Sequence, residues 1–276
     1  MKIATVRTPE GSRAARLDDD GYVLLDAPDA GALLEREDWA DAAASAKGAP
    51  LSPDATALAP VVPRPGKIFC VGLNYRKHIL EMGRALPEHP TLFAKFSDAL
   101  IGPADDIRLA PESSAVDWEA ELTVVIGRTV RRASEREAEA AIAGFTVMND
   151  VTMRDWQFRT KEWLQGKTFE GTTPLGPVLV TPDELPGGVR PALDLTCRVN
   201  GEVMQQADTS ELVFDPVQLI RYASTVITLR PGDVIATGTP GGVGHARKPP
   251  RHLADRDVVI TEIEGIGRLE NTARTA

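Results

Sequence analysis

The stretch VDWEAELTVVIG, residues 116–127, sets three carboxylates at the start of an apolar run. Strand side chains alternate between two faces, so Asp117, Glu119 and Glu121 are expected to share one face. Carboxylates held close together have raised pKa values unless a cation neutralises them. Asp150, at the polar end of the strand-like GFTVMND, adds a further carboxylate. Glu119, Glu121 and Asp150 are therefore candidate ligands of a hard divalent cation, Mg²⁺ or Mn²⁺.

The same residues also fit a simpler interpretation. In it, Glu119 and Glu121 lie on a strand face exposed to water, and Asp150 caps the next turn. The E-x-E pattern is common by chance, so by itself it favours this simpler interpretation. Further functional residues near these carboxylates are needed to favour a metal site over the simpler interpretation.

The segment NYRKHILEMG, residues 74–83, holds a second candidate group. His78 and Glu81 are three residues apart, which makes them neighbours on one face of a helix. A carboxylate beside an imidazole orients it and raises its basicity, as suits a general base that takes a proton from water. Tyr75 adds a polar group next to this pair. The alternative is an ordinary His–Glu pair on a helix surface.

Positively charged and amide side chains follow the candidate ligands along the chain. Arg154 and Gln157 come in the first turns of an expected helix, and Lys167 lies in an expected turn ahead of a strand. Such donors beside a carboxylate-bound metal suit an anionic keto acid as substrate. Local ion pairs and a solvated lysine are the alternative.

A glycine-rich loop in LRPGDVIATGTPGGVG, residues 229–244, includes Thr239 and lets the backbone approach a ligand closely. The loop lacks the spacing of a nucleotide phosphate loop and of a dinucleotide-binding turn. A ligand-binding loop and a plain glycine-rich turn both remain open.

The elements that must position these residues are mostly strands. The sequence predicts a small N-terminal α+β domain over residues 1–62, with one helix over 29–46 capped by Asp29. Residues 63–276 form the second predicted domain, with a hairpin at Asn200-Gly201 and few helices. Helices are expected over residues 74–83, 135–144 and 215–226. The fold class is therefore β-rich α+β, with helices outside a β core.

Composition narrows the class of protein. The chain has 276 residues, a formal net charge of -9 and no block of lysine or arginine, which argues against nucleic-acid binding. No stretch approaches 18 apolar residues, and the N-terminus lacks the pattern of a secretory signal, so no membrane partner is expected. Cys70 and Cys197 lie in apolar strand-like surroundings without metal spacing. We expect buried thiols in a cytoplasmic protein.

Eight segments, in order, resemble the fumarylacetoacetate hydrolase family, including its acylpyruvase and 2-hydroxyhepta-2,4-diene-1,7-dioate isomerase-like members. They cover most of residues 67–272. The segments are VGLNYRKHILEMG, PTLFAKF, DWEAELTVVIG, GFTVMNDVTMRDWQ, GKTFEGTTPLGP, VNGEVMQ, LRPGDVIATGTPGGVG and IEGIGRLEN.

The resemblance implies a core of rolled, mixed β-sheets with peripheral helices, a homodimer, and one Mg²⁺ or Mn²⁺ ion in each active site. It also implies roles for ten residues. The metal ligands are Glu119, Glu121 and Asp150; the catalytic group is His78, Glu81 and Lys167; the substrate-binding residues are Tyr75, Arg154, Gln157 and Thr239.

Two positions depart from the pattern of the family. Glu170 stands where members commonly have aspartate, and Arg256 stands where they have the glycine of a late Gly-Asp pair. The first departure affects a local contact, and the second affects a turn. Asp117 does not match a ligand position, so we expect it to be a hydrogen-bond acceptor behind the ligands or a local turn residue.

The resemblance implies a metal-dependent hydrolase that cleaves a C–C bond in a 2,4-diketo acid, such as an acylpyruvate, fumarylpyruvate or fumarylacetoacetate. In that chemistry His78 activates water, and the metal and Lys167 stabilise the enolate that leaves. The same enolate is also an intermediate in two alternative reactions. These are decarboxylation of an oxaloacetate-type acid and enol–keto isomerisation of a dicarboxylate from aromatic catabolism. A non-catalytic small-molecule binding protein ranks below these, because every metal and dyad position is filled.

Overall fold

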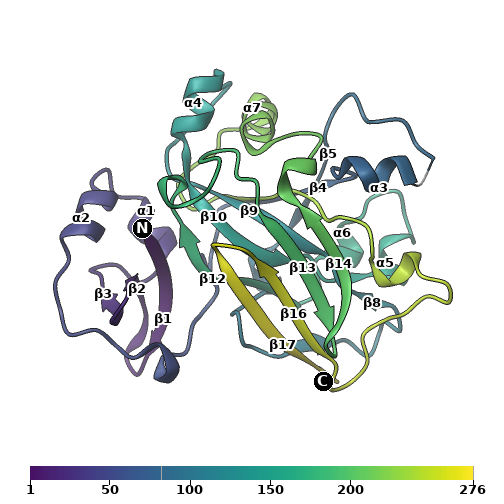
Figure 1. The fold of residues 1–276 in the computed structure, drawn as a ribbon, viewed down its shortest axis with the longest axis horizontal. Coiled ribbons are helices and arrows are strands. Elements are labelled where there is room, and N and C mark those ends of the chain that lie inside the picture. The colour runs from purple at the N-terminus through teal and green to yellow at the C-terminus, as the bar shows by residue number, and fades with distance from the viewer. Residues whose placement is uncertain (82, 276) are drawn as a thin grey trace.

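The structure is a computed structural model of the chain, and it describes residues 1–81 and 83–275. A large mixed sheet lies behind a smaller one, drawn in green and yellow in Figure 1, and helices lie around their edges. Strands β9 and β10 of the large sheet pack against strands β13, β16 and β17 of the small one. This architecture confirms the predicted β-rich core with peripheral helices.

The large sheet has ten strands and contains both antiparallel and parallel pairs. In spatial order its strands are β3 Gly21–Leu24, β2 Gly11–Asp18, β1 Lys2–Thr8, β12 Thr173–Val180, β10 Ile142–Asn149, β9 Ala120–Ile126, β15 Val234–Ala236, β4 Ile68–Gly72 and β5 Thr91–Lys95, and β6 Leu100–Ile101 pairs with β12. Strand β9 is thus central, flanked by β10 and β15.

The second sheet has five strands, and a short two-stranded ladder stands apart from both. The five strands, in order, are β14 Glu202–Asp208, β13 Asp194–Val199, β16 Val258–Ile263, β17 Gly267–Thr275 and β7 Ile107–Leu109, and the short ladder joins β8 Val116–Asp117 to β11 Thr152–Met153. The turn between β13 and β14 is the predicted hairpin. Asn200 and Gly201 both have positive φ there, at 51° and 82°.

Seven α-helices lie among the described residues. They are α1 Ala30–Leu34, α2 Trp39–Ser45, α3 Arg76–Glu81, α4 Glu135–Ala140, α5 Arg154–Gln157, α6 Leu164–Lys167 and α7 Pro216–Val226. None of these helices has the length and apolar character needed to cross a membrane. The helix predicted over 74–83 includes Met82, which lies outside the described residues.

Two helix predictions are wrong in extent. The helix expected over 29–46 is broken into α1 and α2, and between them Arg36 pairs with Asp38 at 3.0 Å. Side chains two residues apart do not face each other on a helix, so this pair belongs to a bend. The cap is confirmed, since Asp29 accepts from the backbone of Ala32.

The helix predicted over 135–144 ends at Ala140, because β10 begins at Ile142 and pairs with β9. Tertiary strand pairing outweighs the local helical pattern there. At Gly144 an added Cβ would lie 2.3 Å from the carbonyl oxygen of Val180, so this tight sheet position needs glycine.

Strand β9 is buried on both faces, as its uninterrupted apolar run predicts. Leu122, Val124 and Ile126 pack in the core between the two sheets, while Val125 packs in the core on the opposite face. Cys70 and Cys197 are free and buried, which confirms the sequence-based expectation for both. A site on β9 therefore has a rigid base.

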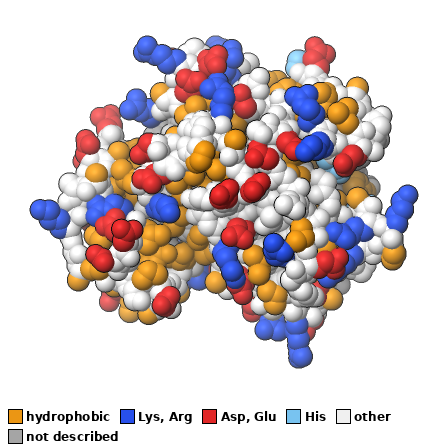
Figure 2. Space-filling model, in the orientation of Figure 1, with side chains coloured by type: hydrophobic (Ala, Val, Ile, Leu, Met, Phe, Trp, Pro, Cys, Tyr) orange, Lys and Arg blue, Asp and Glu red, His pale blue; other side chains and the backbone are white. Residues whose placement is uncertain are grey.

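The N-terminal strands extend the large sheet. Strand β1 pairs antiparallel with β12, with Lys2 opposite Val180 and Ile3 opposite Leu179. Apolar side chains gather over this part of the molecule in Figure 2, while acidic and basic side chains are interspersed on the rest of the visible face. The domain boundary at residue 62 stays a prediction.

Helix α7 offers a test of how local signals support the fold. The Asp215 side chain accepts from the Gln218 backbone at 2.8 Å, and the Gln218 side chain accepts from the Asp215 backbone at 2.9 Å. Replacing Asp215 by alanine removes this capping box and should lower the free energy of unfolding by about 1 kcal/mol.

Urea denaturation followed by circular dichroism measures the change. Asp215→Asn is the matched control, because asparagine also caps helices while it removes the charge that faces Arg190. Equal destabilisation by alanine and asparagine would assign the effect to the Arg190 ion pair instead.

Candidate metal centre and active site

The register of β9 and β10 brings the candidate metal ligands together. Met148 lies opposite Glu121, and the backbone N–H of Asp150 donates to the carbonyl of Glu119 at 2.8 Å. Glu119 precedes β9 and Asp150 follows β10, so both carboxylates lie at the same end of the strand pair. Asn149 fixes this end by accepting from the backbone N–H of Glu119 at 2.9 Å.

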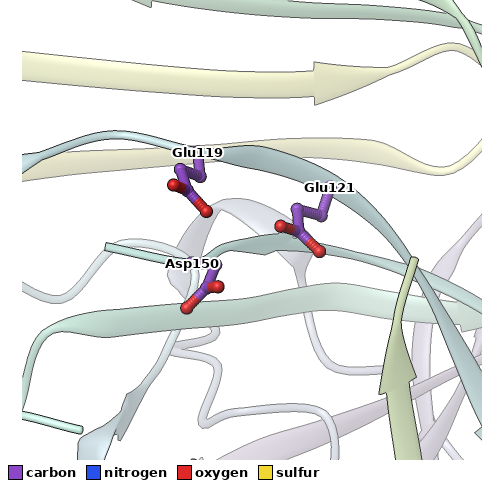
Figure 3. A group of neighbouring side chains, drawn as sticks. All are labelled: Glu119, Glu121 and Asp150. Atoms are coloured by element: carbon purple, nitrogen blue, oxygen red, sulfur yellow. The ribbon is translucent and has the colours of Figure 1, made fainter. Parts of the chain in front are cut away.

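The three carboxylates converge on one space, as Figure 3 shows. Each offers an oxygen that lies within 4.8 Å of the others'. Glu119, Glu121 and Asp150 are only 6%, 1% and 0% exposed. The interpretation of Glu119 and Glu121 as a strand face exposed to water is therefore wrong.

Two buried lysines neutralise part of this charge. Lys167, at the end of α6, places Nζ 2.5 Å from Glu119 and 2.8 Å from Asp150. Lys95, at the end of β5, places Nζ 2.6 Å from the other Asp150 oxygen. Burial alone would raise the pKa of Asp150, but the charges of Lys167 and Lys95 outweigh burial and hold it below its usual value.

Glu121 has the least compensated charge of the three. Among the described residues no cation pairs with it, and the Gly238 backbone N–H donates to it at 2.8 Å. Burial, then the charges of Asp150 and Glu119, raise the pKa of Glu121 well above its usual value. A hard divalent cation bound by carboxylate oxygens would remove this penalty, so the donor set fits Mg²⁺ or Mn²⁺.

Asp117 lies behind the ligands, as expected. It accepts from Arg154 Nε at 2.8 Å and from the backbone N–H groups of Trp118, Gly244 and His245. Arg154 also reaches Glu119 at 2.6 Å, so one guanidinium joins Asp117 to a candidate ligand. Strand β8 ends at Asp117 and β9 begins at Ala120, so the two are not one continuous strand. Asp117 is not among the three carboxylates that converge on the candidate metal site.

Six of the ten predicted site residues line one cavity of about 330 Å³. They are His78, Glu119, Arg154, Gln157, Lys167 and Thr239. Arg154 donates to Gln157 at 2.9 Å, and Thr239 donates to the carbonyl of Ala120 at 3.0 Å. Lys167 ends a helix and does not lie in the turn that the sequence predicts.

His78 and Glu81 lie on α3, and both face Gly241 of the glycine-rich loop. A Cβ added at Gly241 would lie 3.1 Å from His78 Nδ1 and 3.5 Å from a Glu81 oxygen. Burial lowers the pKa of His78, although the charges of Glu81 and Glu119 oppose the shift. The imidazole is therefore neutral at pH 7 and able to accept a proton.

Tyr75 and Glu81 line a neighbouring cavity of about 460 Å³ and not the cavity of 330 Å³. Tyr75 is 1% exposed, and its hydroxyl has no hydrogen-bond partner in the described part of the chain. His78 lines both cavities, so they adjoin at this residue. The substrate-binding role expected for Tyr75 stays a prediction.

Sequence reasoning missed several residues of the site. One feature of the sequence could have marked Lys95, namely a lysine at the end of the largely apolar strand TLFAK. No neighbouring residue, however, indicates that Lys95 lies beside Asp150. Gln205 accepts from Ala120 and donates to Thr239, which ties β14 to the site. Arg84 and Trp163 also line the 330 Å³ cavity. No motif marks them, because they come from separate segments.

The two departures from the family pattern lie outside this cavity. Glu170 is exposed and faces Arg108 at 3.7 Å. Arg256 has φ of 70°, a conformation that favours glycine, in the turn before β16. Both departures therefore concern local structure.

These features are those of a candidate active site in an enzyme on a mixed β fold, with a buried acidic triad that could hold a metal ion. Residues 67–274 match the family model for the fumarylacetoacetate (FAA) hydrolase C-terminal domain, and the chain belongs to this family. Its predicted family membership is confirmed.

Relatives of the chain include isomerases as well as a hydrolase. The chain is 48% identical over 217 residues to the mitochondrial oxaloacetate tautomerase Fahd2a of Rattus norvegicus, covering 78% of this chain and 68% of the rat protein. The fumarylacetoacetate hydrolase of Exiguobacterium antarcticum superposes with a TM-score of 0.86 at 31% identity, covering both chains completely. A 5-carboxymethyl-2-hydroxymuconate delta-isomerase from Mycobacterium smegmatis gives 0.81 at 33% identity, covering 100% and 99% of the two chains.

Glu121→Gln tests the charge imbalance at the centre. Without metal, the variant should be the more stable protein at pH 7, because glutamine keeps the Gly238 hydrogen bond and removes a carboxylate whose pKa is raised by folding. The difference in stability between the variant and wild type should shrink toward pH 4, because there Glu121 of the wild type is protonated in the unfolded chain as well. Mg²⁺ at about 100 times its dissociation constant should stabilise the wild type by about 2.7 kcal/mol and the variant far less.

Thermal melts with a chelator and with Mg²⁺ measure both effects. Glu264→Gln, an exposed substitution of the same type, is the matched control and should behave as wild type. An equal response of Glu121→Gln and wild type to Mg²⁺ would remove Glu121 from the ligand set.

Lys95→Met tests the lysine that the sequence did not assign. It leaves one Asp150 oxygen unpaired and should cost about 3 kcal/mol in chelator. The increase in melting temperature on adding Mg²⁺ should be larger than in wild type, because a positive charge has left the centre. Lys161→Met, at an exposed position, is the control, and an identical Mg²⁺ response in all three proteins would contradict the assignment.

Proposed function

We propose that the chain catalyses keto–enol tautomerisation of a 2-oxo dicarboxylate of the oxaloacetate type, with Mg²⁺ or Mn²⁺ held by Glu119, Glu121 and Asp150. The observation that carries this proposal is the shared cavity of His78 and Lys167. Within this cavity the neutral base His78 and the protonated ammonium of Lys167 line the same small space. Tautomerisation needs these two groups and no attacking water.

Lys167 is suited to hold an anionic oxygen. Burial opposes its charge, but Asp150 and Glu119 raise the pKa of Lys167, so its ammonium stays protonated. We assign it the role of donating a hydrogen bond to the 2-oxo oxygen as negative charge develops there. Arg154 adds a second buried cation in the same wall.

His78 is suited to move the proton. Its lowered pKa keeps the imidazole neutral, so it can take a proton from C3 of the keto acid. As imidazolium, His78 then returns the proton to the 2-oxygen and the enol results. Both steps run in reverse for ketonisation.

A bound divalent cation would supply Lewis-acid stabilisation of the enolate charge. The chain's own residues exclude water beside it: Phe93 and Trp163 pack edge to face, with ring centroids 5.4 Å apart, in the wall of the cavity. Lys167 Nζ lies 5.0 Å from the Phe93 ring centroid. The enolate would therefore form in a partly dry space.

The names of the relatives support isomerisation ahead of hydrolysis. The rat protein is called an oxaloacetate tautomerase, and the Mycobacterium smegmatis structure an isomerase. Hydrolysis of a 2,4-diketo acid is the second candidate, favoured by Glu81 beside His78 at Gly241. Decarboxylation of oxaloacetate would pass through the same type of enolate. The same assay compares its rate with that of tautomerisation.

The test supplies enol oxaloacetate with Mg²⁺ and follows loss of the enol absorbance, with pyruvate release from oxaloacetate and acetylpyruvate measured in parallel. We expect rapid enol loss with little pyruvate. His78→Gln should lower kcat by about 10²–10⁴-fold. For the wild type, kcat/KM should fall as pH drops through a pKa below 6.5, because only neutral His78 accepts the proton.

Lys161→Met, an exposed lysine outside the cavity, should leave the rate unchanged, whereas Lys167→Met should lower it. Full tautomerase activity in His78→Gln would contradict the proton-transfer role. Fast pyruvate release from acetylpyruvate, with no enol turnover, would replace tautomerisation by hydrolysis.

The homodimer and the cytoplasmic location stay predictions. The family supports a small keto-acid substrate for this enzyme, and Arg154 and Lys167 in the cavity suit its anionic groups. Size-exclusion chromatography with light scattering measures the assembly directly.

A further inference from the structure

Arg84 is a cation of the 330 Å³ cavity to which the proposed reaction gives no role. The lining contains three lysine or arginine side chains, Arg84, Arg154 and Lys167, and one carboxylate, Glu119. Arg154 and Lys167 both pair with Glu119, at 2.6 Å and 2.5 Å. Within residues 1–81 and 83–275 no carboxylate pairs with Arg84. Its charge is therefore available to a ligand.

The rest of the cavity wall makes such a charge necessary for an anion. Much of it is apolar and includes Phe93, Phe158, Trp163 and Val243. An ionised carboxylate that leaves water for an apolar space needs a charged hydrogen-bond partner. Each carboxylate of a bound ligand therefore needs its own cation in this lining.

The end of helix α3 sets the position of Arg84. The Gly83 backbone N–H donates to the carbonyl of Leu80 at 2.9 Å, and the Arg84 backbone N–H donates to the carbonyl of Ile79 at 3.2 Å. These are the two bonds of a Schellman motif, in which a glycine of positive φ follows the helix. Gly83 has φ of 68°. Arg84 is thus held at the end of the helix that carries His78.

The charge of Arg84 acts at the proposed base. His78 and Arg84 line the same cavity. Burial is the main cause of the lowered pKa of His78, and the positive charge of Arg84 adds to it. In the proposed reaction His78 takes a proton from C3 of the substrate. In a four-carbon 2-oxo dicarboxylate C3 also bears the second carboxylate, so a cation close to His78 is well placed to meet that group.

His245 is another polar side chain of the lining. Its backbone N–H donates to Asp117 at 3.0 Å. Burial, then the charge of Arg154, lower the pKa of His245, so its imidazole is neutral at pH 7. A neutral ring can donate a hydrogen bond but supplies no charge. Arg84 is therefore better suited than His245 to hold a second carboxylate.

We propose that Arg84 binds the second carboxylate of the substrate and makes the site selective for 2-oxo dicarboxylates. The inference rests on the proposed function, which places the 2-oxo oxygen at Lys167. A guanidinium can hold a carboxylate through two parallel hydrogen bonds, which add geometric selectivity to the attraction of opposite charges. A monocarboxylate would leave this guanidinium without a partner. Arg84 is thus a specificity-determining residue of the site.

The experiment compares the binding of (S)-malate and (S)-lactate to the full chain with Mg²⁺, by isothermal titration calorimetry. These 2-hydroxy acids differ by one carboxylate, and neither can enolise. Wild type should bind malate more tightly. Arg84→Met should weaken malate binding about 10- to 100-fold, the effect of a lost charged hydrogen bond, and change lactate binding less than about twofold. Arg84→Lys should keep part of the preference, because it keeps the charge and loses the planar fork.

Arg76→Met is the matched control, because Arg76 is an exposed arginine of α3 that lines neither cavity. It should bind both acids as wild type does. Arg84 is exposed as well, so neither substitution empties a buried position. In the tautomerase assay with oxaloacetate, Arg84→Met should raise KM more than it lowers kcat.

A wild type that binds malate no more tightly than lactate would overturn the proposal. Equal loss of malate and lactate binding in Arg84→Met would do the same, as would an equal loss of malate binding in Arg76→Met. A wild type without tautomerase activity that keeps an Arg84-dependent preference for malate would reject the proposed reaction and support the assignment of Arg84.

Discussion

Mutual repulsion among Glu119, Glu121 and Asp150 is the interaction on which the rest of the site depends. Carboxylates this close and this buried cannot all be charged without compensation. Lys95, Lys167 and Arg154 supply three cations, from β5, α6 and α5. Within residues 1–81 and 83–275 Glu121 has no such partner, and a divalent cation would compensate its charge.

The same charge network ties distant segments together. The lysine pairs join β5 and α6 to the end of β10, and the Arg154 pairs join α5 to Asp117 and Glu119. Removing Lys95 would leave one Asp150 oxygen without its charged partner, which is costly for a buried group. The network therefore positions the loops that surround the cavity as well as the ligands themselves.

Two cavities that adjoin at His78 of α3 have walls that differ in charge. Lys167 and Arg154 line the cavity of 330 Å³ and suit an anionic keto acid, whereas Asp194 and Asp208 line the other. His78 takes part in both linings.

Local signals predicted much of the fold because they act over short distances. The apolar run of β9, the Asn200-Gly201 turn and the Asp29 cap each depend on neighbouring residues, and all three are present. The helix predictions over 29–46 and 135–144 were too long, because a bend at Arg36–Asp38 and the pairing of β10 with β9 override helical propensity. Local pattern cannot report such contacts.

For the site, the sequence by itself determined which residue types were available: the E-x-E pair, a third carboxylate, a His–Glu pair and a glycine-rich loop, in an order that resembles one family. Only the tertiary structure decided that the carboxylates are buried together and that Lys95 pairs with Asp150. It also decided that Tyr75 lines a different cavity from Lys167. The physical reason is that charge compensation acts through space. Lys95 and Asp150 are far apart in the chain, and only strand register and helix packing bring their charges within 2.6 Å.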